Sequence, residues 1–228
     1  MVNDHSAALD VKRQQLLEAG VIMLDPSAVY VEETVTVGEG TLLLPGTILR
    51  GNTTVGSGCQ IGPNVMITDC TVGDRVTINA SQCEDSRIED GCEIGPYTHI
   101  RPHCVVGTGS KLGAFVQIKN ANLGVGTKMA HLTYVGDSDV GDNCNFGCGS
   151  ITSNYDGFKK HRCTIGDRAF LGCNTNLVAP VTVGEGAYTA AGSTITEDVP
   201  ADALAVARNR QKNLEGWAER NRKLHGEH

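Results

Sequence analysis

The candidate chemistry of this sequence is concentrated in one short stretch, residues 128–145 (KMAHLTYVGDSDVGDNCN). It carries His131, Tyr134 and Asn145 inside a regular six-residue repeat, at positions where the repeat does not require them. An imidazole titrates near neutrality and can transfer a proton, while hydroxyl and amide groups can bind polar substrates. Polar residues that a scaffold does not need are candidates for function, so the rest of the chain is interpreted as the frame that presents them.

The frame is a repeat with a period of six residues, in which glycine often follows the repeated position, as in Val37-Gly38 and Ile61-Gly62. Neither the 3.6-residue period of a helix nor the alternation of a strand explains this spacing. The pattern predicts a hexapeptide solenoid, an all-β fold in which three repeats form one triangular coil and the repeated side chain points inward. The crossover rule alone favours a right-handed coil. The three uninterrupted runs are Val31, Val37, Leu43, Leu49, Val55, Ile61 and Ile67; Ile88, Ile94, Ile100, Val106, Leu112 and Ile118; and Ile165, Leu171, Leu177, Val183, Thr189 and Ile195.

The chain divides into a central solenoid and two ends that differ from it. Residues 8–19 predict a short amphipathic helix that stops at Gly20, so residues 1–30 form a helix and a connector. The solenoid is expected over residues 31–199, with a projecting loop near 153–162, and residues 200–228 form a tail. Because solenoid ends need caps, the N-terminal helix and the segment Arg210–Lys223 are the candidates for them.

Composition excludes several classes of partner. The formal net charge of -7 argues against binding to nucleic acid or to an anionic membrane, because both gain affinity from cationic surface. We find neither a signal-peptide pattern nor an apolar run long enough for a membrane span, and therefore expect a cytoplasmic protein. The 9 cysteines are scattered without CxxC pairs, which predicts small buried thiols rather than a disulfide framework or a metal site.

Several segments outside the repeated positions resemble a known family. They are residues 101–147 (RPHCVVGTG through NCNFG), SNYDG, LVAPVTVG, AAGSTIT and AVARNRQKNLEGW. Together they are similar to the acetyltransferase domain of the bacterial bifunctional N-acetylglucosamine-1-phosphate uridyltransferase/glucosamine-1-phosphate N-acetyltransferase. The resemblance extends from about Gln14 to Trp217. It implies a left-handed parallel β-helix, in place of the right-handed coil, and a homotrimer.

The resemblance also implies roles for residues on the acceptor side. His131 matches the general base that removes a proton as the 2-amino group of the sugar attacks the thioester of acetyl-CoA. Arg101 and Lys119 match residues that bind the sugar 1-phosphate, for which a guanidinium fork and an ammonium group are suited. The remaining substrate-binding positions implied by the match are Tyr134, Asn145 and Asn154.

On the donor side, the resemblance implies acetyl-CoA as co-substrate. The matched positions are Cys148, Asn154, Tyr155, Cys173, Ala191 and Arg208. Cys148 and Cys173 stand where familiar members carry Ala and Ser. A covalent acetyl-cysteine intermediate is conceivable, but direct transfer is favoured because a base for the amine is retained. The basic run at residues 159–162 is interpreted as a solvated loop.

The family's uridyltransferase domain has no counterpart in these 228 residues. We expect no UTP-dependent chemistry, a stand-alone protein, and a separate uridyltransferase as a possible partner. The predicted function is acetylation of glucosamine 1-phosphate to N-acetylglucosamine 1-phosphate, a step toward UDP-N-acetylglucosamine.

Three alternatives remain open. The acceptor could be another amino sugar phosphate or a sugar nucleotide. A metal-dependent carbonic anhydrase of hexapeptide-repeat type would need a site built from His99, His103 and His131, whose spacing does not resemble that family. A non-catalytic trimeric scaffold would not need the complete set of polar residues found here.

Overall fold

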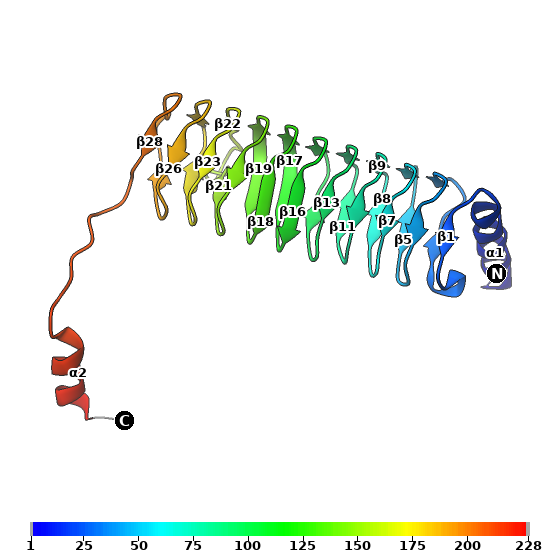
Figure 1. Ribbon diagram of the computed structural model, residues 1–228, viewed down its shortest axis with the longest axis horizontal. Helices are drawn as coiled ribbons and strands as arrows, with labels where there is room; N and C mark the ends of the chain where they lie inside the picture. Colours follow the sequence, from blue (N-terminus) through cyan, green and yellow to red (C-terminus); the bar gives the residue numbers. More distant parts are fainter. Residues whose placement is uncertain (1, 227–228) are drawn as a thin grey trace.

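The computed structural model describes residues 2–226, and side chains from residue 8 onward. It is a long solenoid of short parallel strands with a helix at the N-terminal end and an extended arm at the C-terminal end (Figure 1). Each coil contributes a strand to each of three faces, which we name A, B and C in chain order. Corner 1 joins face A to face B, corner 2 joins B to C, and corner 3 joins C to the next A.

Parallel pairing between successive coils runs the length of every face. Face A is a sheet of β1 (Ile22–Met23), β4 (Leu42–Leu43), β7 (Gln60–Ile61), β10 (Thr77–Ile78), β13 (Glu93–Ile94), β16 (Lys111–Ala114), β18 (Lys128–His131), β20 (Asn145–Phe146), β23 (Phe170–Leu171), β26 (Tyr188–Thr189) and β28 (Leu204–Ala205). Face B contains β2 (Tyr30–Val31), β5 (Ile48–Arg50), β8 (Met66–Thr68), β11 (Gln82–Glu84), β14 (His99–Ile100), β21 (Ile151–Ser153), β24 (Asn176–Val178) and β27 (Thr194–Ile195). Face C contains β3 (Thr36–Val37), β6 (Thr54–Val55), β9 (Thr71–Val72), β12 (Arg87–Ile88), β15 (Val105–Val106), β22 (Cys163–Ile165) and β25 (Val181–Val183).

Two longer strands turn corner 2 without a break. They are β17 (Gln117–Leu123) and β19 (Tyr134–Val140), which pair with each other from Gln117↔Tyr134 to Leu123↔Val140. Both bend at a residue with a positive φ, Asn120 (φ 46) in β17 and Asp137 (φ 47) in β19. Asn and Asp tolerate this left-handed conformation better than most residues, so the sequence allows the bend. These strands therefore join faces B and C where the candidate site lies.

The predicted six-residue repeat is the core of the molecule. Nearly every repeated residue is buried, and those of successive coils stack along the axis about 4.8 Å apart. Ile61, Ile78 and Ile100, for example, are completely inaccessible to solvent. Full burial of one such side chain contributes about 1.5–3 kcal/mol, so the stability of the solenoid accumulates coil by coil.

The N-terminal helix α1 (Val2–Glu18) caps the first coil, as the sequence predicts. Leu16 of this helix belongs to the buried core, and Arg13 Nε donates a 2.8 Å hydrogen bond to the carbonyl of Val29. The helix begins earlier than expected. Strand β1 pairs with β4 immediately after it, so the solenoid starts at Ile22, within the segment expected to be a connector.

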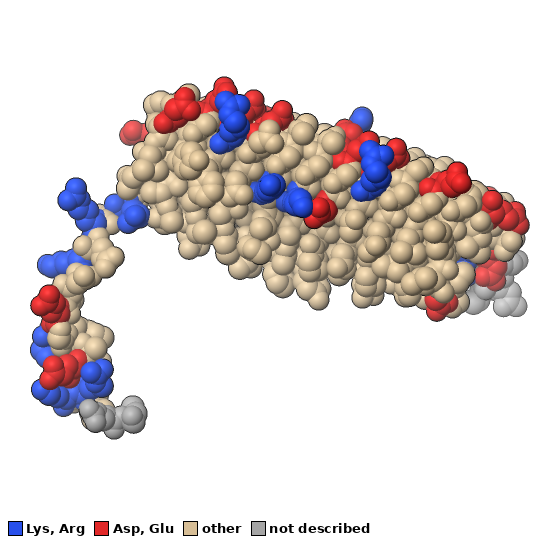
Figure 2. Space-filling view, in the orientation of Figure 1, with Lys and Arg blue, Asp and Glu red and all other residues tan. Residues whose placement is uncertain are grey.

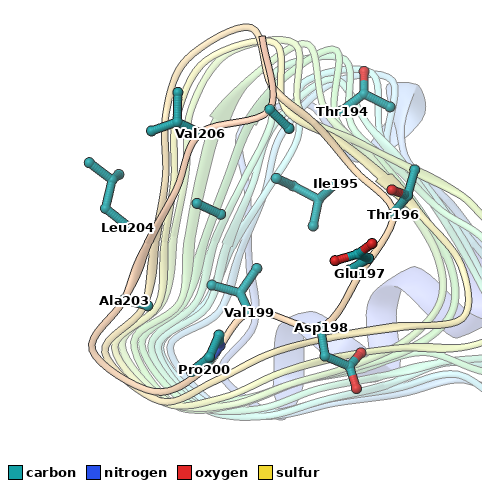
Figure 3. A pocket seen from close by; sticks show the side chains of 12 residues that line it. Thr194, Ile195, Thr196, Glu197, Asp198, Val199, Pro200, Ala203, Leu204 and Val206 are labelled. Atoms are coloured by element: carbon teal, nitrogen blue, oxygen red, sulfur yellow. The ribbon is translucent and has the colours of Figure 1, made fainter.

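The C-terminal tail does not form the expected cap. Helix α2 (Trp217–His225) has no buried residue and lies at the end of an extended arm, remote from the solenoid (Figure 1). The last coil closes on itself instead: Ile195 and Val199 point into its interior and are nearly inaccessible (Figure 3). A hollow of about 340 Å³ lies beside them, lined by residues 194–200 and 203–207. The arm carries several basic side chains (Figure 2), and its large apolar residues Leu214, Trp217 and Leu224 are exposed rather than packed on the coil end.

Candidate functional site

The predicted base and three predicted donor-side residues form one column along corner 1. The pairings Met129↔Phe146, Phe146↔Leu171 and Leu171↔Thr189 align β18, β20, β23 and β26. Continued by two residues, the same register aligns His131, Cys148, Cys173 and Ala191, one on each of four successive coils. Neighbours in this column are separated by about 4.8 Å, the spacing of adjacent strands. The residues share a register position and the exposed edge of face A.

Arg208 lies at the C-terminal end of this column. Its Cδ would be 3.7 Å from a Cβ placed on Gly192, the residue after Ala191. Two hydrogen bonds hold the start of the arm there, from Thr194 N to the Ala207 carbonyl (3.2 Å) and from Ala207 N to Ser193 Oγ (3.1 Å). Arg208 is exposed, so its guanidinium is available to an anionic group that lies along the column.

A second group of predicted residues gathers on face B near corner 2. Arg101 and Lys119 occupy the same position in consecutive coils, because Arg101 N donates to the carbonyl of Ile118 (2.9 Å). Lys160 from the projecting loop lies beside Lys119, and its proximity lowers the pKa of the Lys119 ammonium, with smaller contributions from desolvation and from Arg101. Three cationic side chains therefore converge on one point, which creates a local anion site on an acidic protein.

A buried carboxylate anchors this side of the site. Asp137 is 5% exposed and accepts hydrogen bonds from Asn120 Nδ2 (2.5 Å) and from Asn154 Nδ2. Burial alone would raise the pKa of Asp137, but the two amide donors, with Lys160 and Lys119 nearby, outweigh it and lower that pKa. The ionised Asp137 thus ties the loop residue Asn154 to the bend of β17.

Tyr134 and Asn154 meet over a glycine. A Cβ on Gly136 would lie 2.4 Å from Tyr134 Oη and 2.7 Å from Asn154 Nδ2, distances that real Cβ atoms do not show. The absence of a side chain at position 136 therefore allows the phenol and the amide to fold back over the strand. Gly136 pairs with Lys119, so both polar groups lie next to the cationic cluster.

The projecting loop leaves the solenoid at corner 2, between β21 and β22. Arg162 fastens its C-terminal end through bonds from Nε and Nη2 to Asp139 (2.9 and 2.7 Å), from Nη2 to the Ser138 carbonyl (3.0 Å) and from Nη1 to the Asn120 carbonyl (3.1 Å). These guanidinium bonds lower the pKa of Asp139. The basic residues 159–162 are largely exposed, as predicted, but Arg162 fixes the loop to the site.

Inside the loop, Asp156 accepts bonds from Phe158 N (2.7 Å), Lys159 N (2.6 Å) and the ring of His161 (2.7 Å). The Lys159 N–H bond and the His161 contact are the leading causes that hold the pKa of Asp156 at about 2. Tyr155 is 58% exposed and its hydroxyl donates to the Gly157 carbonyl (2.6 Å). These local bonds give the loop a defined conformation.

Not every predicted residue joins a group within a single chain. Asn145 lies on face A, between Lys128 and Phe170 in the register, on the other side of corner 1 from Arg101 and Lys119. Asn154 and Tyr155 are at corner 2, whereas the other four donor-side residues follow corner 1. Among the side chains described, residues 8–226, no three His, Cys, Asp or Glu side chains gather as ligands for a metal. The histidines of the carbonic anhydrase alternative are dispersed: His99 is on face B, His103 pairs with Asp85 (3.0 Å) at corner 2, and His131 is at corner 1.

Comparison with known proteins identifies relatives of this chain. The model for bacterial transferase hexapeptide proteins (six repeats) matches residues 34–69, 85–120 and 162–197. The chain is also 52% identical over 199 residues to the bifunctional protein GlmU of Brevibacillus brevis. The chain therefore contains the hexapeptide repeats of bacterial transferases. The resemblance to one domain of the bifunctional proteins, expected from the sequence, is confirmed.

The match includes most of this chain but less than half of its relatives. The alignment with the Brevibacillus brevis protein covers 87% of the chain and 43% of the relative. A second bifunctional protein GlmU, from Geobacillus sp., is 50% identical over 88% of the chain and 44% of its own length. This coverage is consistent with similarity to one domain, as the sequence suggests.

A solved structure with the same architecture is the UDP-N-acetylglucosamine acyltransferase of Francisella novicida. It superposes with a TM-score of 0.56 at 18% identity, over 90% of this chain and 74% of that one. At this identity the likeness concerns the fold alone. The fold is the left-handed parallel β-helix implied by the resemblance, not the right-handed coil favoured by the crossover rule. Neither helix within residues 2–226 is long and apolar enough to cross a membrane.

Sequence reasoning missed Asn120, Gly136, Asp137 and Lys160. The first three could have been found from the repeat, because a separation of 17 or 18 residues corresponds to one coil and places residues side by side. Asn120 and Asp137 have this separation. Lys160 could not have been found in this way, since its position depends on how the loop folds back.

Proposed function

We propose that the protein transfers the acetyl group of acetyl-CoA to the 2-amino group of glucosamine 1-phosphate. His131 accepts a proton from the amine as its nitrogen attacks the thioester carbonyl. Collapse of the tetrahedral intermediate forms the amide bond, breaks the carbon–sulfur bond and releases the thiol of coenzyme A. Transfer is direct, so no acetyl group resides on Cys148 or Cys173.

The observation that carries this proposal is the column His131, Cys148, Cys173 and Ala191. A base at one end and small side chains along the next three coils give an extended thioester a path that ends at the proton acceptor. Arg208 beside Gly192 supplies a positive charge to the phosphates of the coenzyme at the far end. Similarity of about 50% to the bifunctional proteins supports acetyl transfer as the reaction.

For the acceptor, the cationic cluster of Arg101, Lys119 and Lys160 suits the sugar 1-phosphate. Tyr134 and Asn154 over Gly136 are suited to the sugar hydroxyls. Cys148 and Cys173 place small side chains along the donor path, which is compatible with a thioester. A different amino sugar phosphate would use the same cluster, and the assay below distinguishes such an acceptor from glucosamine 1-phosphate.

We further propose that the working form is a homotrimer. Asn145 on face A lies across corner 1 from the acceptor group, so a second copy has to bring its face A toward that group. Exposed apolar side chains at corner 1 form a ridge beside His131, against which a second copy could pack. Tyr97 and Phe115 stack there with ring centroids 5.3 Å apart, and Leu132 follows on the next coil.

The test is to incubate the purified protein with acetyl-CoA and glucosamine 1-phosphate and to detect the acetylated sugar by mass spectrometry. His131→Ala should lower the rate by about 10²–10⁴-fold without unfolding, because His131 is exposed. His225→Ala, at an exposed histidine on the C-terminal arm, is the matched control. No product from a folded trimer would overturn the proposed acceptor, and an unchanged rate in His131→Ala would overturn the proposed base. Glucosamine 6-phosphate and UDP-glucosamine, supplied in parallel, test the alternative acceptors.

A further inference from the structure

The nine cysteines separate into two classes. Seven are buried: Cys59, Cys70, Cys83, Cys92, Cys104, Cys144 and Cys163. Burial raises the pKa of these thiols, to about 12 for Cys70 and about 11 for Cys163. Cys173 is exposed and Cys148 is half-buried. Since a thiol has to meet its oxidant, reactivity toward solutes is confined to Cys148 and Cys173.

These two accessible thiols are neighbours in the column at corner 1. The bonds from Gly147 N to the Leu171 carbonyl (2.7 Å) and from Asn174 N to the Cys148 carbonyl (2.8 Å) set Cys148 directly opposite Cys173. Paired residues on adjacent strands are about 4.8 Å apart, within the range of about 4.4–6.8 Å between the Cα atoms of a disulfide. Residues in register also present their side chains on the same side of the sheet.

The location allows the small movement that a bond requires. Cβ atoms of a disulfide lie about 3.8 Å apart, so the two Cβ atoms, in register at about 4.8 Å, have to approach by about 1 Å. Cys148 and Cys173 lie beyond the ends of β20 and β23, and each precedes a turn residue with positive φ, Gly149 (φ 76) and Asn174 (φ 54). Each cysteine thus lies at a turn beyond the strand end, where its carbonyl accepts one inter-coil bond, from Asn174 N for Cys148 and from Gly192 N for Cys173 (2.8 Å each).

We propose that Cys148 and Cys173 form a site of reversible oxidation, a dithiol that hydroperoxides convert into a disulfide linking two coils. The thiolate of one cysteine attacks the peroxide oxygen and becomes a sulfenic acid, and water (or an alcohol) leaves. The thiol of the other attacks the sulfenic sulfur, forms the S–S bond and releases a second water. Two thiols are oxidised, the peroxide is reduced, and a dithiol reductant reverses the change by exchange.

If the proposed function holds, the position of this cysteine pair means that its oxidation lowers the rate of acetyl transfer. Cys148 and Cys173 lie between His131 and Ala191, in the middle of the path assigned to the thioester. A bond between them draws two coils together and changes the surface on which the donor lies. A displacement of about 1 Å in such a site can lower a rate by about a hundredfold.

The first measurement does not depend on activity. The 228-residue chain is treated with hydrogen peroxide, remaining thiols are alkylated under denaturing conditions, and peptides are mapped by mass spectrometry. The expected product is a peptide pair joined through Cys148 and Cys173 within one chain, with seven alkylated cysteines. Cys163→Ala, at a buried thiol, should retain the link, whereas Cys148→Ala and Cys173→Ser should abolish it. A folded protein in which each thiol is oxidised separately, or linked only between chains, would refute the proposal.

The second measurement concerns acetyl transfer, with each variant compared to its own reduced activity. Peroxide should lower the rate of the natural chain by at least about tenfold, and dithiothreitol should restore it. Cys148→Ala and Cys173→Ser should lose less than about twofold under the same treatment, because no link forms. A mapped link with an unchanged rate would refute the effect on the donor path. Absence of acetyl transfer in the reduced protein would instead refute the proposed function, and the disulfide result would stand.

Discussion

At the scale of single residues, the acceptor side depends on a residue without a side chain. Tyr134 Oη and Asn154 Nδ2 occupy the space where a Cβ of Gly136 would lie, and Lys119 is its partner in the neighbouring strand. No other residue type leaves both polar groups in this position. The sequence reveals the glycine, but only the register reveals what lies above it.

We therefore predict that Gly136→Ala impairs acceptor binding more than folding. The added methyl group displaces the phenol and the amide, so the KM for the amino sugar phosphate should rise by about tenfold or more while the protein remains folded. Steady-state kinetics and circular dichroism measure the two effects. Gly91→Ala is a suitable control, because a Cβ there meets nothing within 4 Å, although its φ of +65 costs some stability. Equal effects of both substitutions on KM would contradict this account.

Asp137 provides a prediction about pH. The fold lowers its pKa, so the folded state favours the carboxylate. The stability that this provides is complete above the unfolded pKa of about 3.9, and it is lost as the pH falls through the lower folded value. Asp137→Asn should lower the free energy of unfolding by about 1–3 kcal/mol at pH 7.

The difference between the natural chain and Asp137→Asn should shrink as the pH falls below about 4, because the natural carboxylate then becomes protonated. Thermal unfolding from pH 7 to pH 3 measures it. Glu215→Gln makes the same change of charge on the exposed arm and serves as the control. A difference that stays constant over this range would show that the charge of Asp137 does not stabilise the fold.

At the scale of elements, the loop between β21 and β22 is fixed through one side chain. Arg162 makes two bonds to Asp139 and two to backbone carbonyls, and it holds the loop that supplies Asn154 and Lys160. A lysine retains the charge but cannot reproduce the planar fork.

Arg162→Lys should therefore loosen the loop without unfolding the solenoid. We expect faster hydrogen exchange at residues 154–162 and a higher KM for the acceptor, by about tenfold, because a charged two-bond contact is worth about 1.5–3 kcal/mol. Lys159→Ala, in the same loop, is the control, since the contact that Lys159 makes is through its backbone N–H. Unchanged exchange in Arg162→Lys would mean that other contacts hold the loop.

The sequence alone specifies some elements well and others poorly. The solenoid follows from the six-residue repeat, because few other folds place an inward apolar side chain at every sixth position. The N-terminal helix follows from apolar spacing and from Gly20. The prediction that the C-terminal tail caps the solenoid was wrong, because the helix in the tail has no residue buried on the last coil. The loop was recognised as an interruption, but its anchoring through Arg162 depends on contacts distant in sequence, which periodicity does not encode.

At the scale of the whole molecule, Asn145 and the cationic cluster lie on different sides of corner 1. Asn145 faces away from the cluster around Arg101 and Lys119, so one chain does not assemble all of the predicted residues around one point. If copies of the chain share each site, a site can be completed by residues from different chains.

This arrangement predicts complementation between inactive variants. Asn145→Ala and Arg101→Ala should each lose activity alone, but after mixed reassembly some sites receive both natural residues from neighbouring subunits. Activity should then recover to a fraction of the natural value set by the statistics of mixing. Arg101→Ala mixed with Lys119→Ala is the control, because those two residues lie on the same face and the same chain supplies both. No recovery in the first mixture would place Asn145 and Arg101 of one chain in the same site.

The column from His131 to Ala191 also sets the distance between the base and the residues that bind the donor. The distance between base and donor-binding residues is a whole number of coils, each adding about 4.8 Å along the axis. Inserting or deleting one coil between Phe146 and Leu171 would shift the register of the donor relative to the base by a full step. A coil added before β11 would lengthen the molecule and leave that distance unchanged. Tolerance of coil-length insertions should therefore be high in the N-terminal half of the solenoid and should end at the coil that carries the base.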